Sequence, residues 1–401
     1  MSINKLIHVS APSFIKTKDS LIINMMEDHG DGGIVLKNHL KELIAGSPQK
    51  RISYHDYMDA VLYTPNIGYY ARAKEKIGTR GDFYTSGNVG DAFGRSLARW
   101  FVYLIKRCGV SPIIIEVGAG DGKLAYDILV FIKEIEPHIW DSLTYILVDG
   151  SPFHRKIQQE RIGIFKQAVS AASLEKWTNV NGIVFSNELF DALPVHVIEK
   201  YKGALVEVFV TEKEGDLVEE REPLDNPDIL SYLTERTITL NEKQRYEVPL
   251  KMVREYKKIV SCIESGILLT IDYGYTDKEW KEPAHLQGSL RGYYQHQMIK
   301  DALMYPGDMD LTTHIHFDTL IEIGKRKDLS IQGLFLQNEF LLKAGILEEL
   351  KDHQGTDPFS KTAKRNRAIR GLIVPGGFSE HFKVLLQSKN LAEDVRIFPE
   401  W

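Results

Sequence analysis

Residues 113–124, IIIEVGAGDGKL, decide the fold of this 401-residue chain. The stretch begins with a short run of β-branched residues, which is typical of a strand buried on both faces. Three glycines follow at alternate positions, Gly118, Gly120 and Gly122. Apolar residues then recur at helical spacing from Leu124 to Ile135. The stretch therefore predicts a strand, a tight glycine loop and a helix, which together form the first half of a βαβ unit.

The chemistry of this loop narrows the class of ligand. Its spacing differs from the glycine fingerprints of dinucleotide-binding and Walker loops. Glu116 and Asp121 lie where a phosphate-binding loop would avoid negative charge, and Lys123 offsets only part of it. We therefore expect a ligand that has positive charge and hydroxyl groups but no phosphate, and S-adenosylmethionine fits that description. The alternative is a glycine-rich turn that binds no ligand.

Composition excludes several classes of protein. Hydrophobic residues make up 43% of the chain and charged residues 26%, values that are ordinary for a globular protein. A net charge of −5 gives the whole chain no electrostatic attraction to nucleic acid. The two cysteines, Cys108 and Cys262, are too few for a disulfide framework or a cysteine-based metal site. No apolar run approaches the length of a membrane span. From the net charge we therefore expect no nucleic-acid binding, and from the lack of a long apolar run we expect no membrane insertion.

The N-terminal segment bears on the compartment. Residues 1–18 contain three lysines and no acidic residue, which leaves a targeting leader open. A mitochondrial leader usually contains arginines, and the first arginine here is Arg51. We expect a cytoplasmic protein, or one of the mitochondrial matrix if the source is a eukaryote.

A second acidic residue follows the next predicted strand. Residues 143–149 form an apolar run that ends in Asp149. An acidic residue at the end of the second strand is where a bound ribose presents its hydroxyl groups. Because a carboxylate accepts two hydrogen bonds, Asp149 is a candidate for binding the ribose. The alternative is a solvated aspartate at the end of a strand.

Polar residues also follow a third predicted strand, residues 182–186. The next segment, NELFDALP, begins at Asn187 and contains Glu188 and Asp191. In an open α/β sheet, ligands bind beyond the carboxyl ends of the strands. Carboxylates can hold and polarise a guanidinium group through paired hydrogen bonds. We therefore take these three residues as catalytic candidates, with helix capping as the alternative role of Asn187 or Asp191.

A long segment separates this strand from the next buried one. Strand-like runs follow residue 195, and helices are expected near residues 228–235 and 249–263. The acidic, proline-bearing segment 216–228 is expected to be a loop, and residues 267–274 read as a buried strand with a polar end. The separation is too long for an ordinary crossover, so we interpret it as an inserted cap.

The C-terminal part contains two features that could carry function. His314 and His316 would share one strand face and suggest a metal, but no cysteine lies nearby and we expect none. Asp310 and Thr312 are expected to fix a loop. A basic cluster in residues 361–370 is expected to be a solvated face, with an acidic partner as the alternative.

Taken together, the motifs resemble the MidA-type family of S-adenosylmethionine-dependent methyltransferases. The mitochondrial members of that family are complex I assembly factors that methylate an arginine of a core subunit. The matching blocks occur in order along the chain. They are residues 65–70, 81–86, 116–122, 186–196, 288–291 and 306–317.

The resemblance implies an α/β, Rossmann-like class I methyltransferase with a seven-stranded mixed sheet, helices on both faces and an inserted cap subdomain. It divides the chain into an N-terminal helical segment with a cofactor lid (1–90), a core (91–195 and 264–401) and the cap (196–263). Two positions depart from the family pattern. Gly87 and Asn88 replace a Pro-Glu pair in the lid, and Asp149 replaces a glutamate. The cofactor-binding candidates are Asp82, Thr85, Glu116, Gly118, Gly120, Asp121 and Asp149.

The sequence thus predicts methyl transfer from S-adenosylmethionine to a protein side chain, with an arginine nitrogen as the acceptor. Two rivals stay open. One is a nicotinamide-dependent oxidoreductase, which the acidic loop disfavours. The other is a non-enzymatic assembly or binding factor that has kept the pocket. The oligomeric state is also open, with a homodimer among the alternatives.

Overall fold

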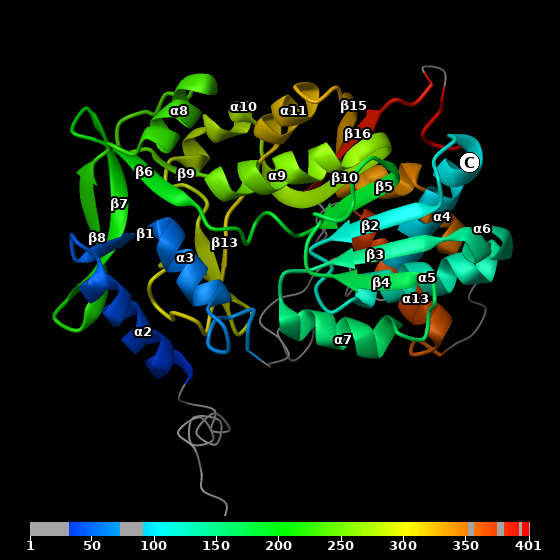
Figure 1. Cartoon of the computed structure of the whole chain (residues 1–401), viewed down its shortest axis with the longest axis horizontal. Coiled ribbons are helices and arrows are strands. Elements are labelled where there is room, and N and C mark those ends of the chain that lie inside the picture. The colour runs from blue at the N-terminus through cyan, green and yellow to red at the C-terminus, as the bar shows by residue number, and fades with distance from the viewer. Residues whose placement is uncertain (1–31, 73–90, 352–356, 375–380, 393–394, 401) are drawn as a thin grey trace, which may run out of the picture.

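The computed structural model describes residues 32–72, 91–351, 357–374, 381–392 and 395–400. Figure 1 shows a large sheet with helices on both faces beside a second, smaller sheet. The helix α9 runs across the upper half of the view, below α11, between these two parts. Among the described residues, every helix is too short or too polar to span a bilayer.

The large sheet has the order β15-β16-β10-β5-β2-β3-β4, and the two-residue strand β14 pairs with β10 as an eighth member. The five strands from β4 to β10 are mutually parallel, and β16 is antiparallel to both of its neighbours. This path of seven strands confirms the predicted methyltransferase sheet. The bounds are β2 Ile113–Val117, β3 Thr144–Val148, β4 Ala168–Ala171, β5 Val180–Asn187, β10 Ile263–Tyr275, β14 Ile315–His316, β15 Ser330–Leu336 and β16 Phe382–Lys389.

Helices bury both faces of the large sheet because its strands are apolar on both sides. Ile114 belongs to the core on one face and Ile115 to the core on the other, as the two-residue period of a strand requires. The first core is covered by α4 Ala92–Arg107, α5 Lys123–Ile135, α6 Pro137–Ser142, α7 Pro152–Ile162, α12 Gln337–Lys343, η3 Ile346–Glu349 and α13 Lys361–Ile373. The second is covered by α9 Leu250–Cys262 and α11 Phe317–Lys325.

The second sheet is antiparallel and has the order β1-β7-β6-β9, with β8 on the outer side of β7. The two-residue turn Lys202-Gly203 joins β6 to β7, and both residues have positive φ, 53° and 82°. Because β1 comes from the N-terminal segment, this sheet combines residues from two of the three predicted domains, and the predicted boundaries stay a prediction. The bounds are α2 Gly32–Gly46, β1 Arg51–Ser53, α3 Tyr54–Tyr63, β6 His196–Tyr201, β7 Ala204–Lys213, β8 Asp216–Pro223, α8 Pro227–Glu235 and β9 Arg245–Val248.

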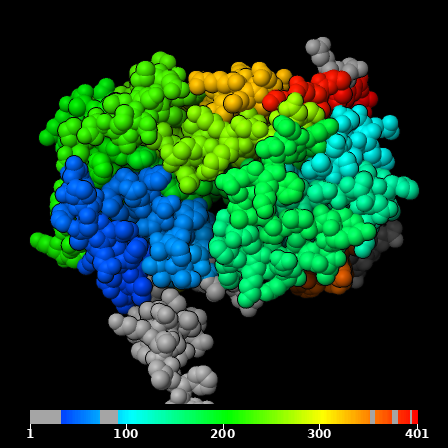
Figure 2. Space-filling view, in the orientation of Figure 1, coloured from blue at the N-terminus to red at the C-terminus, as the bar shows by residue number. Residues whose placement is uncertain are grey.

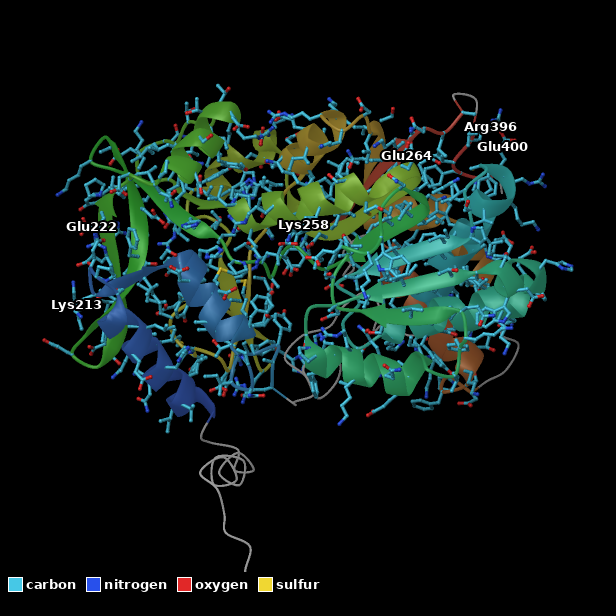
Figure 3. The ribbon with its side chains drawn as sticks, viewed as in Figure 1. Lys213, Glu222, Lys258, Glu264, Arg396 and Glu400 are labelled. Carbon is cyan, nitrogen blue, oxygen red and sulfur yellow. The ribbon has the colours of Figure 1, made fainter. Side chains whose placement is uncertain are left out.

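The prediction of a loop at residues 216–228 is wrong for residues 216–223. Residues 216–223 form β8, which pairs with β7 along its whole length. The glutamates of β8 pair with arginines from β1 and β9, two other strands of this sheet. Arg51 Nη1, for example, donates to Glu222 Oε1 at 2.7 Å, and Figure 3 labels Glu222 at this edge of the molecule. Such cross-strand pairing makes an acidic strand acceptable, and charge composition alone does not reveal it.

A third, three-stranded sheet brings the C-terminal motifs to the edge of the large sheet. Its order is β12-β11-β13, and Arg291 of β11 lies opposite Thr312 of β13. Asp310 and Thr312 therefore lie in a strand, where we expected a loop, because β11 supplies the pairing partner. The remaining bounds are α10 Asp277–Trp280, η2 Pro283–His285, β11 Arg291–Tyr294, β12 Gln297–Ile299 and β13 Asp310–Thr312.

Candidate active site

A cavity of about 1680 Å³ lies beyond the carboxyl ends of β2, β3, β5 and β10. Residues from the end of α3 and from α9 close its other sides. Figure 2 shows the N-terminal part (blue) and the segment after β3 (green) meeting along one seam of the surface. Nine aspartate or glutamate side chains but only four lysine or arginine side chains line the cavity among the described residues. Such a lining favours a cationic ligand.

The glycine loop forms one wall of this cavity. Gly118, Gly120 and Gly122 all have positive φ, at 76°, 53° and 75°. A Cβ atom on Gly118 would lie 2.6 Å from Cδ1 of Leu189, so the loop has no room for a side chain there. Gly118, Gly120 and Asp121 all line the cavity, as predicted.

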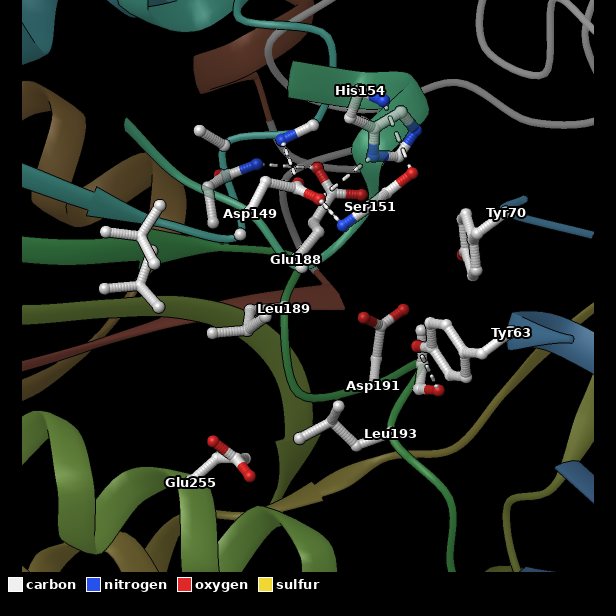
Figure 4. Close-up of a pocket in the computed structure, with 18 of the residues that line it drawn as sticks. Tyr63, Tyr70, Asp149, Ser151, His154, Glu188, Leu189, Asp191, Leu193 and Glu255 are labelled. Atoms are coloured by element: carbon white, nitrogen blue, oxygen red, sulfur yellow. Dashed lines mark hydrogen bonds and ion pairs between the residues drawn. The ribbon is translucent and has the colours of Figure 1, made fainter. Parts of the chain in front are cut away.

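Asp149 joins the two loops that border the predicted cofactor position. Its Oδ2 accepts a hydrogen bond from the backbone N–H of Gly120 at 2.8 Å, and its Oδ1 accepts one from Ser151 at 2.8 Å. His154 Nδ1 lies 3.4 Å from the same Oδ1, as Figure 4 shows. A carboxylate has about four acceptor positions, so the group can still bind a diol. Its role with the ribose stays a prediction.

Glu116 lines the cavity but is almost entirely buried, and Tyr145 donates a hydrogen bond to its Oε2 at 2.6 Å. Burial raises the pKa of Glu116 to about 8. The Tyr145 hydrogen bond opposes this shift, and the charges of Asp121 and Asp149 add to it. We had counted Glu116 as a negative charge of the loop. In the folded protein it is largely a neutral acid at pH 7, because the surrounding apolar atoms disfavour its ionised form.

Glu116→Gln tests this protonation state in the protein without ligand. The folded pKa is raised from 4.5 to about 8, so the stability that the neutral acid contributes is fully present below pH 4.5 and is lost as pH rises through 8. Glutamine cannot ionise, so we expect the stability of the variant relative to wild type to rise by up to about 1.4 kcal/mol per pH unit in that window. Urea unfolding from pH 5 to pH 9 measures the difference. Parallel pH profiles for the two proteins would contradict this expectation.

The predicted catalytic residues follow β5, and Figure 4 shows Glu188, Leu189, Asp191 and Leu193 along this loop. Glu188 has a φ of +51°, a conformation that a residue with a side chain rarely adopts and that clusters at functional sites. Its backbone N–H donates to the carbonyl of Ile271 in β10 at 2.9 Å, which fixes this conformation. Asn187 Nδ2 donates to Glu188 Oε1 at 3.1 Å. All three candidates line the cavity.

Asp191 is the buried carboxylate at the centre of this group, with 6% of its surface exposed. The hydroxyl of Tyr273 donates to its Oδ2, and the backbone N–H of Thr313 donates to its carbonyl at 2.8 Å. Burial raises the pKa of Asp191 to about 6, while the Tyr273 hydrogen bond and the nearby Arg291 charge oppose the shift. Asp191 is therefore mostly ionised above pH 7.

Asp272 holds this loop against β10, and we did not assign it a role from the sequence. The side chain is fully buried and accepts hydrogen bonds from the backbone N–H groups of Phe190, at 3.0 Å, and Tyr273, at 2.9 Å. Burial and the neighbouring Asp191 charge raise the pKa of Asp272 well above its ordinary value. The polar end of the strand at residues 267–274 was the only signal for it.

Two tyrosines from the N-terminal part complete the wall near Asp191. Tyr63 donates to the carbonyl of Ala192 at 2.9 Å, and Tyr70 donates to Asp310 Oδ1 at 2.8 Å. Their rings stack with centroids 5.7 Å apart, and Figure 4 shows the Asp191 carboxylate beside the Tyr63 ring. The block at residues 65–70 was the sequence signal for Tyr70, and no motif pointed to Tyr63.

The lid candidates Asp82 and Thr85 lie outside the described residues. His314 and His316 are both buried but have different partners, Arg291 for His314 and Tyr246 for His316. In the part of the chain that the structure describes, no group of three histidine, cysteine, aspartate or glutamate side chains is arranged to hold a metal.

Comparison with known proteins identifies a family for this chain. Residues 96–335, more than half of the chain, match the family described as "Putative S-adenosyl-L-methionine-dependent methyltransferase". The chain belongs to this methyltransferase family. The acidic cavity fits the cofactor of this family because S-adenosylmethionine is cationic. The three glycines of the loop fit it because they leave room for a ligand beside the backbone. The predicted cofactor is confirmed, and the nicotinamide alternative is set aside.

Relatives extend the match over most of the chain. The chain is 27% identical to the Drosophila melanogaster protein named "Protein arginine methyltransferase NDUFAF7 homolog, mitochondrial". The match extends over 360 residues and covers 81% of this chain and 78% of that protein. The chain is 26% identical to the Danio rerio protein of the corresponding name, which covers 90% of this chain and 88% of that protein. A crystal structure of a COG1565 superfamily member from Burkholderia thailandensis, bound to S-adenosyl-homocysteine, is 26% identical. It has a TM-score of 0.80 and covers 96% of this chain and 97% of that chain.

Proposed function

We propose that this methyltransferase modifies an arginine side chain of a protein. The observation that carries the proposal is the buried Asp191 carboxylate beside Tyr63, on the loop that also carries Glu188, in a cavity where carboxyl groups outnumber cations. Carboxylates at such a position bind a guanidinium through charge-assisted hydrogen bonds. Relatives named as protein arginine methyltransferases support the same acceptor.

The cofactor supplies a methyl group that is already activated by the adjacent sulfonium. The work of the chain is to position the acceptor nitrogen in line with the breaking bond and to exclude water. Asp191 and Glu188 accept hydrogen bonds from the guanidinium, turn one nitrogen toward the methyl carbon and favour loss of its proton. The C–S bond breaks as the N–C bond forms, and Asp191, ionised above pH 7, is suited to take the released proton.

Asp191 is held in one orientation for this task. Its Oδ2 accepts from Tyr273, and the backbone N–H groups of Asp191 and Ala192 also favour the ionised carboxylate. An ionised, buried carboxylate favours a charged donor such as a guanidinium N–H. The MidA-type resemblance implies a subunit of respiratory complex I as the acceptor protein. The relatives are named as mitochondrial proteins. We propose the mitochondrial matrix for a eukaryotic source and the cytoplasm otherwise.

Quantitative mass spectrometry of protein methylation in cells with and without this chain tests the proposal. We expect at least one methylated arginine to disappear without the chain and to return with the wild-type protein. Glu188→Ala should restore about tenfold less of the mark, because one of the two carboxylates at the acceptor is lost. Glu160→Ala, on the exposed face of α7, is the matched control and should restore it fully. A mark that changes only on residues other than arginine would contradict the acceptor, while the cofactor assignment would stand.

A further inference from the structure

Arg291 is a cation at the cavity wall that has no anionic partner in the described parts of the chain. It begins β11 and lies over the rings of Tyr273, 5.8 Å from the centroid, and Tyr293, 6.0 Å from the centroid. Its only hydrogen-bond partner among the described residues is the neutral ring of His314, and its buried Nε has none. No carboxylate oxygen of a described residue lies within ion-pair distance of it. A partly buried guanidinium that lies within ion-pair distance of no described carboxylate favours an anion as its ligand.

His314 adds a second donor beside Arg291. Its Nε2 accepts the hydrogen bond from Arg291, so its Nδ1 carries the ring proton. That Nδ1 is buried and has no partner among the described residues. Burial and the Arg291 charge lower the pKa of His314 to about 2, so the ring stays neutral at physiological pH. Tyr273 and Tyr275 hold the ring edge-on, with centroids 5.4 and 4.2 Å away.

These two donors lie on the acceptor side of the cavity. Tyr273, which donates to Asp191, contacts both Arg291 and His314. The glycine loop, by contrast, follows β2, and β5 separates β2 from β10 in the sheet. The β10 side of the cavity thus presents a carboxylate, Asp191, beside two fixed donors. A ligand that matches this wall has a guanidinium and a carboxylate close to each other.

We propose that Arg291 and His314 bind a carboxylate that is carried by the acceptor next to its target arginine. Arg291 supplies charge and a hydrogen bond from Nε, and His314 supplies a hydrogen bond from Nδ1. An acidic residue adjacent to the target arginine provides this group. This inference rests on the proposed arginine acceptor. The methionine part of the cofactor is another source of a carboxylate, and the experiment separates the two sources.

The test measures binding rather than turnover. Two acetylated, amidated peptides are titrated by calorimetry into the protein saturated with S-adenosyl-homocysteine. One has the sequence Gly-Asp-Arg-Asp-Gly and the other Gly-Asn-Arg-Asn-Gly. We expect the aspartate peptide to bind at least about tenfold more tightly to the wild type, since a charge-assisted pair is lost with asparagine. Arg291→Gln should abolish the difference between the peptides, and Arg291→Lys should keep part of it, because the charge stays while the Nε donor is lost.

Two controls separate the outcomes. Affinity for S-adenosyl-homocysteine should stay within about twofold of wild type in Arg291→Gln, which also shows that the variant is folded. Arg367→Gln on α13, outside the cavity, removes the same charge and should keep the tenfold preference. Equal binding of the peptides to wild type, including no measurable binding of either, overturns the inference. It is also overturned if Arg291→Gln weakens S-adenosyl-homocysteine as much as the aspartate peptide. Aspartate-dependent binding, with no methyl transfer to the peptide once S-adenosylmethionine replaces S-adenosyl-homocysteine, would instead count against the proposed function alone.

Discussion

Asp191→Asn is expected to reduce methyl transfer at least about 100-fold while the affinity for S-adenosyl-homocysteine stays near that of wild type. Asparagine has nearly the same shape and can still accept the hydrogen bond from Tyr273. It cannot carry the negative charge that we propose orients the guanidinium, nor can it take a proton from the acceptor. Transfer of radiolabelled methyl groups into protein from cells that lack this chain measures the rate, and calorimetry measures the affinity.

The control for this variant is Asp141→Asn, an exposed aspartate on α6, which should leave both quantities unchanged. Transfer by Asp191→Asn at more than half the wild-type rate would remove Asp191 from the catalytic group. An equal loss of transfer and of S-adenosyl-homocysteine binding would instead mean that the residue supports the cofactor side of the cavity.

Gly118→Val is expected to weaken cofactor binding at least about 100-fold, because two effects act on the same loop. A β-branched residue is strongly disfavoured at a φ of +76°. Its Cβ would also lie 2.6 Å from Leu189 Cδ1, so the side chain of Leu189, on the loop that carries Glu188 and Asp191, must shift. Calorimetry with S-adenosylmethionine measures the loss.

Gly109→Val isolates the contribution of backbone strain. Gly109 has a similar φ, +67°, and a Cβ there meets no atom within 4 Å. We expect this variant to lose about 1–2 kcal/mol of stability and to keep its cofactor affinity. Wild-type affinity in Gly118→Val would show that the cofactor does not depend on the shape of this loop, and the site assignment would fail.

The cofactor half of the site could be predicted because its signals are local. The strand at residues 113–117, the glycine spacing and the helix that follows are neighbours in sequence, and each has its own period or conformational requirement. Asp149 follows from the same reasoning, since the ends of parallel strands meet at one edge of a sheet. The segment 216–228 shows the opposite case. Residues 216–223 of this segment form a strand by pairing with β7, and Arg51, more than 150 residues earlier, offsets the charge of Glu222.

The acceptor half depends on contacts between distant segments. The residue pattern gave Glu188 and Asp191 as candidates, but Tyr63, Asp272 and Arg291 come from three other parts of the chain. A tyrosine at the end of a helix or an arginine in a short strand has no periodic signature. Their roles become visible only where α3, β10 and β11 meet.

The sequence by itself determined the sheet, the glycine loop and the class of cofactor. The apolar period of the strands, the spacing of the glycines and their backbone conformation all depend on residues that are consecutive in the chain. Only the tertiary structure decided which carboxyl groups carry charge. Glu116 and Asp191 are both acidic residues in the sequence, yet burial keeps Glu116 largely protonated at pH 7, against the effect of the hydrogen bond from Tyr145. Asp191 ionises near pH 6 because Tyr273 and Arg291 oppose the effect of burial. Desolvation depends on every atom packed around a group, so it is a property of the fold rather than of any stretch of the chain.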